Sequence, residues 1–418
     1  MTATLRRVAA GLLREARQLG VAGQALWMVA AGLAALRAYQ AWSGAGDLRI
    51  IWLAGRHLLD GAPVFDDPYF IYLPTSAVLA APFALLPEDV GIHVGILLCC
   101  VGVLTLCWAS ARLLARPGSW WVAPAAAAMV LISYAGGDLI TVANTEFVPL
   151  AMLPFILFAA TRNRWTTFAV LLGLSIAVKP FLIALLLLPL LDRRWRAFAL
   201  ALAIPVVGSA LALLLVADRG TFLHRTVPNL VHGQSILDNP SNASMANLLS
   251  YVGVPDDWAI LLRGALVVIG LGAALLRWRR RSGDQVVRIV EVGTLLVLTS
   301  SLASSVVWSH YTLMLVPLLV TAARPGAVSG RTAVLWPLLL PMFALGYPLV
   351  VPTVWATVMV RAGVALVLIL LVLAWQCVRV PARPGVPHQP AGALGDERSP
   401  AAQPTDAGGR GRDRRSTP

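Results

Sequence analysis

Charged residues are scarce in this chain, and lysine is almost absent from it. Only 13% of the 418 residues are Asp, Glu, Lys or Arg, whereas soluble domains carry about 25%. Of the 33 residues counted as Lys plus Arg, a single one, Lys179, is a lysine. The four cysteines lie in apolar segments without metal-ligand spacing. These features exclude a soluble domain and a disulfide scaffold, and the histidines show no paired spacing, so no metal is expected.

Apolar runs long enough to cross a bilayer recur from one end of the chain to the other. Hydrophobic residues make up 58% of the sequence, and the mean hydropathy is +0.76. The net charge of +13 comes from arginines grouped in short segments between the apolar runs, which is the pattern of cytoplasmic loops. The sequence therefore predicts an all-α, multi-pass membrane protein with both termini in the cytoplasm and no nucleic-acid partner.

Counting the apolar runs predicts about twelve membrane helices within residues 21–378. Residues 1–20 form a basic cytoplasmic N-terminus, and we expect the first span to remain uncleaved because no convincing cleavage site follows it. Three outer segments are expected at 43–89, 135–147 and 217–257. The tail 379–418 is rich in Pro, Gly, Arg and Ala, a composition typical of disordered cytoplasmic segments. No internal repeat is visible, which disfavours inverted-repeat transporters.

Lys179 lies in the middle of the apolar stretch Leu171–Leu191 and is followed by Pro180. A charge at membrane depth costs about 2.5–3.5 kcal/mol, so it is by default a functional-site hypothesis. Arginines both precede and follow the stretch, so both of its ends are expected in the cytoplasm, although it is too short for two full spans. The sequence predicts a short hairpin that turns at Lys179-Pro180 inside the membrane. The alternative is a snorkelling lysine at a helix end.

Under this topology the unusual polar residues collect on the outer side of the membrane. They follow different helices, yet the arginine-rich segments place all of them on this side: Asp47, Asp138, Asn144, Glu146, Lys179, Asn242, Ser244, Trp308 and His310. Loops are polar in any protein, but Lys179 and Glu146 directly adjoin apolar helices. We therefore expect a polar site that faces the extracytoplasmic half of the bilayer.

Several segments, in order along residues 47–317, carry a family resemblance. They read Gly46-Asp47, LLDGAPVFDD, YLPTSAVLAAPFALLP, Asn144, AVKPFLIALLLLPLLDRRWRAF, NPSNASMANLL and VVWSHYTLMLVPLL. On these motifs the chain resembles the polyprenyl-phosphate-dependent membrane glycosyltransferases of the GT-C superfamily, specifically glycosyltransferase family 87. Within that family it looks most similar to the mycobacterial-type α-(1→3)-arabinofuranosyltransferases of cell-wall arabinan.

The resemblance implies a plasma-membrane enzyme that transfers arabinofuranose from decaprenyl phosphate to a growing cell-wall arabinan or lipoglycan on the periplasmic, extracytoplasmic side, with α-(1→3) branching. The lipid-linked donor is a substrate, and no cofactor is expected. The family chemistry implies a single displacement with inversion, for which one carboxylate suffices. Two alternatives stay open. One is α-mannosyl transfer from polyprenyl-phosphate-mannose to phosphatidylinositol mannosides or lipomannan, and the other is a transporter or flippase of lipid-linked sugars.

The resemblance also suggests which residues carry out catalysis. Asp47 is the candidate general base that removes the proton of the acceptor hydroxyl. Glu146 or Asp138 is the runner-up for this role. His310 is assigned to catalysis together with Asp47, and both His310 and Asn144 are expected to orient the sugar or the phosphate.

A second group of residues is expected to bind the substrates. Lys179 would neutralise the leaving phosphate in a site that excludes water, and Arg56 or Arg225 would assist it. The expected contacts to sugar or acceptor are Asn144, Glu146, Tyr72, Asn242, Ser244 and Trp308.

Overall fold

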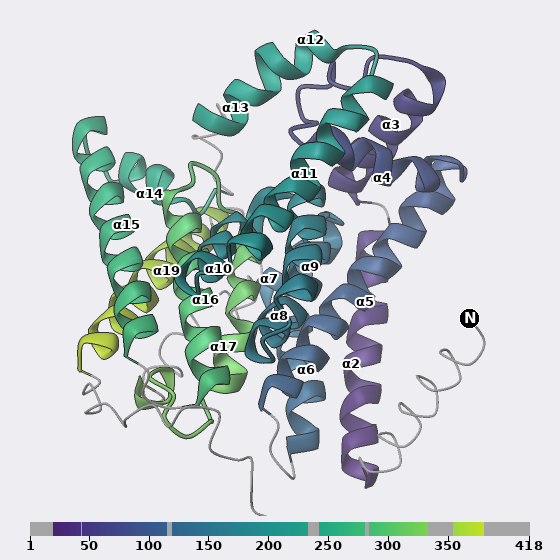
Figure 1. Ribbon diagram of the computed structural model, residues 1–418. Helices are drawn as coiled ribbons and strands as arrows, with labels where there is room; N and C mark the ends of the chain where they lie inside the picture. Colours follow the sequence, from purple (N-terminus) through teal and green to yellow (C-terminus); the bar gives the residue numbers. More distant parts are fainter. Residues whose placement is uncertain are drawn as a thin grey trace, which may run out of the picture. The chain divides into compact units, whose positions relative to one another are not determined.

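The computed structural model describes residues 20–42, 44–114, 119–232, 242–280, 284–332 and 354–379, and within these ranges it contains helices and no strand (Figure 1). All of them belong to one compact unit, Met1–Ala382. The expected cytoplasmic N-terminus and nearly all of the expected tail lie outside the described residues. The all-α membrane class predicted from the sequence is confirmed.

Six described helices are long and apolar enough to cross a bilayer. They are α2 (Gly20–Ala41), α5 (Glu88–Leu114), α11 (Trp195–Leu215), α15 (Asp256–Arg279), α16 (Gln285–Ala303) and the part of α19 (Val354–Arg379) from Ala362 onward. A bent pair, η1 plus α6 (Ser119–Ile132) followed by α7 (Tyr134–Thr141), makes seven if it counts as one span. The predicted number of about twelve and the cytoplasmic position of the termini stay predictions, and residues 333–353 lie outside the described part of the chain.

Shorter helices fill the space between these spans. The apolar ones are α8 (Phe147–Thr161), α9 (Trp165–Val178), η2 (Pro180–Leu186), α10 (Leu187–Leu191), η4 (Ser309–Leu315) and α17 (Val316–Thr321). Helix α16 is the most buried of the six long helices and α11 the least. Beyond Arg196 in its first turn, the exposed side chains of α11, among them Val206, Val207 and Leu211, are apolar, as expected for a helix that faces lipid.

The helix break predicted at Lys179 is present. Helix α9 ends at Val178, Lys179 is extended with φ −155° and ψ 128°, and Pro180 opens η2. The break follows from local chemistry, because the ring of a proline disfavours the helical conformation of the residue before it. Its consequence is that the aliphatic stem of Lys179 leaves the helical path and is free to enter a site.

A second break separates α6 (Val122–Ile132) from α7, which is bent away by 71°. Ser133 is extended, and its hydroxyl accepts a hydrogen bond from the N–H of Gly136, so it caps the start of α7. This is the preferred role of serine at a helix start. Segment 135–147, expected as an outer loop, therefore begins with a helix that carries Asp138.

The two other expected outer segments also contain helices. Residues 43–89 hold α3 (Gly46–Asp60) and α4 (Pro74–Ala84), and residues 217–257 hold α12 (Arg219–Thr221), η3 (Phe222–Thr226), α13 (Val227–His232) and α14 (Met245–Tyr251). Aromatic residues from both segments, including Phe65, Phe70 and Phe222, share one small hydrophobic cluster. The Asp218 carboxylate accepts hydrogen bonds from the backbone N–H groups of Val64 and Phe65 at 2.9 and 2.6 Å. The two segments therefore form one folded layer, while their exact boundaries and sidedness stay predictions.

Candidate active site

Asn144 joins three of the residues singled out in the sequence. Its side-chain N–H donates to Oδ2 of Asp47 at 2.6 Å, and its carbonyl oxygen accepts from Nζ of Lys179 at 3.1 Å and from the backbone N–H of Glu146 at 2.9 Å. Asn144 is buried. Because one amide contacts both the start of α3 and the break after α9, it fixes the distance between Asp47 and Lys179.

The ammonium group of Lys179 lies in an anionic and aromatic environment. Its Nζ is 3.2 Å from Oε1 of Glu146, whose side chain is fully buried, whereas the lysine side chain is 15% exposed. The same ammonium also lies over the rings of Tyr72 and Tyr311, with Nζ 5.6 and 5.7 Å from the two ring centroids. Aromatic faces attract cations at such distances. The charge is therefore stabilised in a buried position without being enclosed completely.

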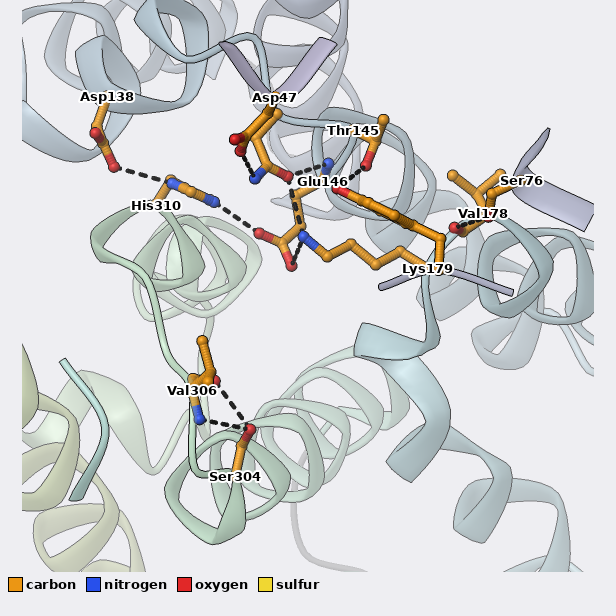
Figure 2. Close-up of polar contacts among 12 residues, drawn as sticks. Asp47, Ser76, Asp138, Thr145, Glu146, Val178, Lys179, Ser304, Val306 and His310 are labelled. Atoms are coloured by element: carbon orange, nitrogen blue, oxygen red, sulfur yellow. Dashed lines mark hydrogen bonds and ion pairs between the residues drawn. The ribbon is translucent and has the colours of Figure 1, made fainter. Parts of the chain in front are cut away.

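Two hydroxyl groups of α4 hold the backbone on the N-terminal side of Lys179. Thr75 Oγ1 donates to the carbonyl oxygen of Ala177 at 2.6 Å, and Ser76 Oγ donates to that of Val178 at 2.8 Å (Figure 2). The last carbonyls of a helix have no partner within the helix, and Pro180 has no N–H to offer. Helix α4 thus supplies the missing donors and holds the break in place.

His310 connects two carboxylates. Its Nδ1 is 3.0 Å from Oδ2 of Asp138, its Nε2 is 2.8 Å from Oε2 of Glu146, and Ser309 Oγ also donates to Oδ2 of Asp138. Figure 2 shows the resulting row of Asp138, His310, Glu146 and Lys179. A histidine ring that lies between two carboxyl groups can donate from both of its nitrogens only as an imidazolium.

The three carboxylates of the site differ in the number and charge of the groups that contact them. Glu146 is buried and has one oxygen beside Lys179 and the other beside His310. Asp138 is bound to His310 and Ser309. The side chain of Asp47 has one hydrogen bond from a neutral amide. Burial raises the pKa of Asp47 above its ordinary value of 3.8, and the charge of Lys179 and the hydrogen bond from Asn144 offset this only in part. Asp47 is therefore the carboxylate best suited to accept a proton.

Two arginines that were expected to help Lys179 have other partners. Arg56 Nε is 2.8 Å from Oδ2 of Asp60 on α3, in an exposed pair at the i,i+4 spacing that brings helix side chains together. Arg225 donates to the backbone carbonyl of Asp67 at 3.4 Å. Neither bond involves the residues around Lys179, so the assisting role of these arginines stays a prediction.

Asn242 and Ser244 are buried, and their side chains bind backbone groups. Asn242 donates to the carbonyl of Ser305 at 2.9 Å and accepts from the N–H of Val307 at 3.0 Å. Ser244 Oγ accepts from the N–H of Asn247 and so caps α14. These bonds order the segment that leads into Trp308, whose extended backbone precedes η4. The binding roles expected for these residues stay predictions.

Some residues of the site were not singled out from the sequence. Tyr311 directly follows His310 in the segment VVWSHYTLMLVPLL. Its position next to His310 in the sequence was the available signal. Thr75 and Ser76 follow a proline at a helix start, which predicts an N-terminal turn but not a partner about a hundred residues away. Among the described residues, no group of three or more His, Cys, Asp or Glu side chains has the geometry of a metal site.

The fold and the site together define a polytopic helical membrane protein with a buried row of charges that ends in a lysine at a helix break. Comparison with known families is consistent with this class. The model of glycosyltransferase family 87 matches residues 70–305, which is more than half of the chain. The chain belongs to glycosyltransferase family 87, as its motifs predicted.

Curated relatives with assigned activities include arabinofuranosyltransferases and a mannosyltransferase. The chain is 30% identical over 275 residues to an alpha-(1->3)-arabinofuranosyltransferase of Mycobacterium tuberculosis, which covers 63% of this chain and 61% of that protein. It is 27% identical over 253 residues to the Corynebacterium glutamicum protein of the same name, covering 56% and 57%. A polyprenol-phosphate-mannose-dependent alpha-(1-2)-phosphatidylinositol mannoside mannosyltransferase of M. tuberculosis is 28% identical over 292 residues, covering 64% and 66%.

The matched regions are partial. The chain spans about three-fifths of the length of the first of these relatives, and no solved structure matches it. The family match at 70–305 includes Asn144, Glu146 and Lys179 but neither Asp47 nor His310. The hydrogen bond of Asn144 to Asp47 and the contact of Glu146 with His310 link those two residues to the matched region.

Proposed function

We propose that the chain is a membrane glycosyltransferase of the plasma membrane that transfers arabinofuranose from decaprenyl phosphate to an arabinan or lipoglycan acceptor on the extracytoplasmic side, with α-(1→3) branching. The observation that carries the proposal is the position of Lys179. It lies at a helix break, beside Glu146 and two tyrosine rings, and one amide links it to a carboxylate that can act as a base.

The donor phosphate is assigned to Lys179. An ammonium group has three N–H donors, and Asn144 and Glu146 account for two of them. The third is available to a phosphate oxygen. A compact ammonium stabilises the charge that develops on a leaving phosphate, and its effect is large where water is excluded.

An apolar cavity beside the lysine supports a lipid-linked donor. Its volume is about 110 Å³. Its polar boundary is formed by Tyr72, Ser76 and Thr145 and its apolar wall by residues of α3, α4 and α5, including Trp52 and Gly91. Tyr72 also contacts Lys179. An isoprenoid chain in this cavity would therefore start next to the cation that binds its phosphate.

Asp47 is assigned as the general base. The acceptor hydroxyl oxygen forms a bond to the anomeric carbon, the bond from that carbon to the phosphate oxygen breaks, and its electron pair leaves on the phosphate, which Lys179 neutralises. The hydroxyl proton moves to Asp47. Because attack and departure occur on opposite faces, the step inverts the anomeric centre, and a single carboxylate is enough.

His310 and Glu146 prepare the site in this mechanism. The imidazolium of His310 holds one oxygen of Glu146, and the other oxygen holds the ammonium of Lys179. Glu146 is thereby fixed as a counter-ion, which keeps the lysine charged and oriented before the donor binds. Asn144 sets the position of the base relative to the lysine.

Mannosyl transfer is the second candidate function. It is favoured by the similarity to the mannosyltransferase, which covers a slightly larger share of the relative than the arabinofuranosyltransferase matches do. Arabinose is preferred because the chain is 30% identical to the M. tuberculosis arabinofuranosyltransferase and 28% identical to the mannosyltransferase. Both functions use the same phosphate and base assignments.

Purified protein incubated with a synthetic glycan acceptor tests the proposal, with decaprenyl-phospho-arabinose and decaprenyl-phospho-mannose supplied separately. We expect a new glycosidic bond with the arabinosyl donor, and we expect Lys179→Met to form it about 10²- to 10³-fold more slowly. The exposed Arg162→Met variant serves as a control that removes a cation elsewhere. If product forms with the mannosyl donor alone, mannosyl transfer replaces arabinosyl transfer as the function. No product from either donor, with movement of intact donor across a vesicle membrane, would establish the transporter alternative instead.

A further inference from the structure

Arg37 is a charged residue within the first membrane helix that the proposed mechanism does not use. It lies near the end of α2, and it is only 7% exposed. A buried arginine in a membrane helix is costly unless its donors are satisfied, and such residues commonly have a function. The partners of Arg37 therefore indicate what it does.

The guanidinium of Arg37 binds the end of α6. Its Nε donates to the carbonyl of Leu131 at 2.9 Å and an Nη donates to that of Ile132 at 3.2 Å. The other Nη binds Oε1 of Gln40 at 2.9 Å. The carbonyls of a helix end attract cations and lack partners in their own helix. Arg37 thus stabilises the carbonyl end of α6 at the point where the chain bends by 71°.

The same guanidinium also contacts the first half of α7. A Cβ atom on Gly137 would lie 2.7 Å from Cζ of Arg37 and 3.0 Å from both of its terminal nitrogens. Any other residue at this position would displace the guanidinium from where it now lies. Arg37 therefore touches both sides of the bend, and the next residue after Gly137 is Asp138.

We propose that Arg37 is a positioning residue that fixes the bend between α6 and α7 and, through Asp138, the orientation of His310. The path is short and continuous: Gly137 packs on the guanidinium, Asp138 binds Nδ1 of His310, and Nε2 of His310 binds Glu146. The effect of Arg37 on sugar transfer rests on the proposed function, whereas its effect on the orientation of His310 does not.

The test compares Arg37→Met with Arg277→Met in the full-length protein in detergent, at a temperature at which both variants are folded. Arg277 is equally enclosed, at 1% exposed, but it pairs with Glu291 in another part of the molecule. The first readout is the ¹⁵N signal of the His310 ring, assigned by its loss in His310→Gln. Asp138, Glu146 and Tyr311 contact that ring, Asp47 interacts with it electrostatically, and Lys179 reaches it through Glu146.

We expect the wild type and Arg277→Met to show an imidazolium at about pH 7, and Arg37→Met to show a neutral tautomer or an exchanging mixture. The second readout is steady-state transfer. Displacing a catalytic group by about 1 Å costs about a hundredfold, so kcat should fall by about that factor in Arg37→Met. The KM for the donor should change by less than about twofold. The cation assigned to the donor phosphate is Lys179, which follows α9 and is not part of α6 or α7. Arg37→Lys should restore part of kcat, since an ammonium reaches one of the two carbonyls.

Gly137→Ala provides the same test if Arg37→Met does not fold, because it displaces the guanidinium while keeping its charge. Wild-type ring signals and kcat in a folded Arg37→Met or Gly137→Ala variant would overturn the proposal, as would an equal change of the ring signals in Arg277→Met. If the wild type forms no glycosidic bond with any donor, the proposed function fails, and the ring signals alone decide the role of Arg37.

Discussion

Two ion pairs of this protein each join a basic side chain to a buried glutamate, and they differ in the groups that surround them. Lys179 lies 3.2 Å from Glu146, and Arg277 lies 2.6 Å from Glu291. Both acids are almost completely buried. The lysine side chain is 15% exposed, whereas the arginine is 1% exposed.

In the pair at Arg277, both oxygens of the Glu291 carboxylate accept hydrogen bonds from the fold. One oxygen of Glu291 binds the guanidinium, and the other accepts from the backbone N–H groups of Val328 and Ser329 at 2.6 and 3.1 Å and from the Ser329 hydroxyl at 3.3 Å. Every contact joins parts of the fold to one another. The pair at Lys179 has polar contacts to Asn144 and Glu146, and in the proposed function its ammonium also binds the donor phosphate while the nearby Asp47 accepts the proton. The comparison therefore sets a carboxylate saturated by the fold against a pair to which we assign a substrate.

The largest effect is expected from Arg277→Met, which leaves the Glu291 carboxylate buried without its cation. Breaking one side of a buried pair costs about 3–5 kcal/mol, so thermal unfolding in detergent should shift far downward. Arg194→Met is the control, because its pair with Asp192 is half-exposed and surface pairs contribute about 0–1 kcal/mol. If the two variants are equally stable, the Arg277–Glu291 pair does not have the structural role assigned to it here.

Asp47→Asn should reduce sugar transfer by about 10²- to 10⁴-fold, the usual contribution of a general base. The amide keeps nearly the same size, so the unfolding temperature should change little. Transfer close to the wild-type rate by this variant, measured with the purified protein, would exclude Asp47 as the base. The same loss in Glu146→Gln together with wild-type transfer by Asp47→Asn would move the role to Glu146.

Lys179→Met should lower transfer by about 10²- to 10³-fold, because one group that stabilises the developing oxyanion is removed. Its effect on stability should be smaller than that of Arg277→Met, since Glu146 retains His310 as a partner. Lys179→Arg should not restore the rate, because the planar guanidinium group of arginine does not fit in the place of the compact ammonium group. Comparing kcat with the unfolding temperature for both cation variants checks the distinction between the pairs.

The pH dependence of transfer should reflect the environment of Asp47. A general base acts when it is ionised, and burial raises its pKa above 3.8. The rate should therefore be full at high pH and fall as pH decreases through the raised value, with a midpoint above that of an exposed aspartate. A rate profile for kcat/KM in the wild type measures this midpoint, and an acid limb at or below 3.8 would contradict it.

The smallest effect is expected from Ser76→Ala, which removes the hydrogen bond to the Val178 carbonyl. The loss of one such bond costs about 0.5–1.5 kcal/mol. Ser301→Ala is the matched control, because Ser301 also donates to a helix carbonyl, that of Val297 at 3.0 Å, but on α16. Both should lose similar stability, and only Ser76→Ala should also lower transfer, since it releases the backbone beside Lys179. Equal transfer in the two variants would show that α4 does not orient the lysine.

Much of the site could be predicted from the sequence because membrane physics makes certain residues conspicuous. A lysine in an apolar stretch is costly, and a proline after it breaks the helix, so Lys179 and its break were both expected. The same argument did not lead to Arg37, although it lies in the first apolar run, because arginines near the ends of a span are common. Its role depends on the bend of α6 and α7, which local sequence indicates only through Ser133 and the following glycines.

Composition and local chemistry by themselves determined the membrane class, the break at Lys179 and the set of polar residues from which the site is built. They did so because hydropathy, proline geometry and charge act on each segment separately. Only the tertiary structure decided which of these residues meet. It joined Asp47 to Lys179 through Asn144, placed His310 between Asp138 and Glu146, and gave Arg56 and Asn242 other partners. Hydrogen bonds and ion pairs act over about 3–4 Å, and distances of that size between remote segments are set by the packing of the whole helical unit.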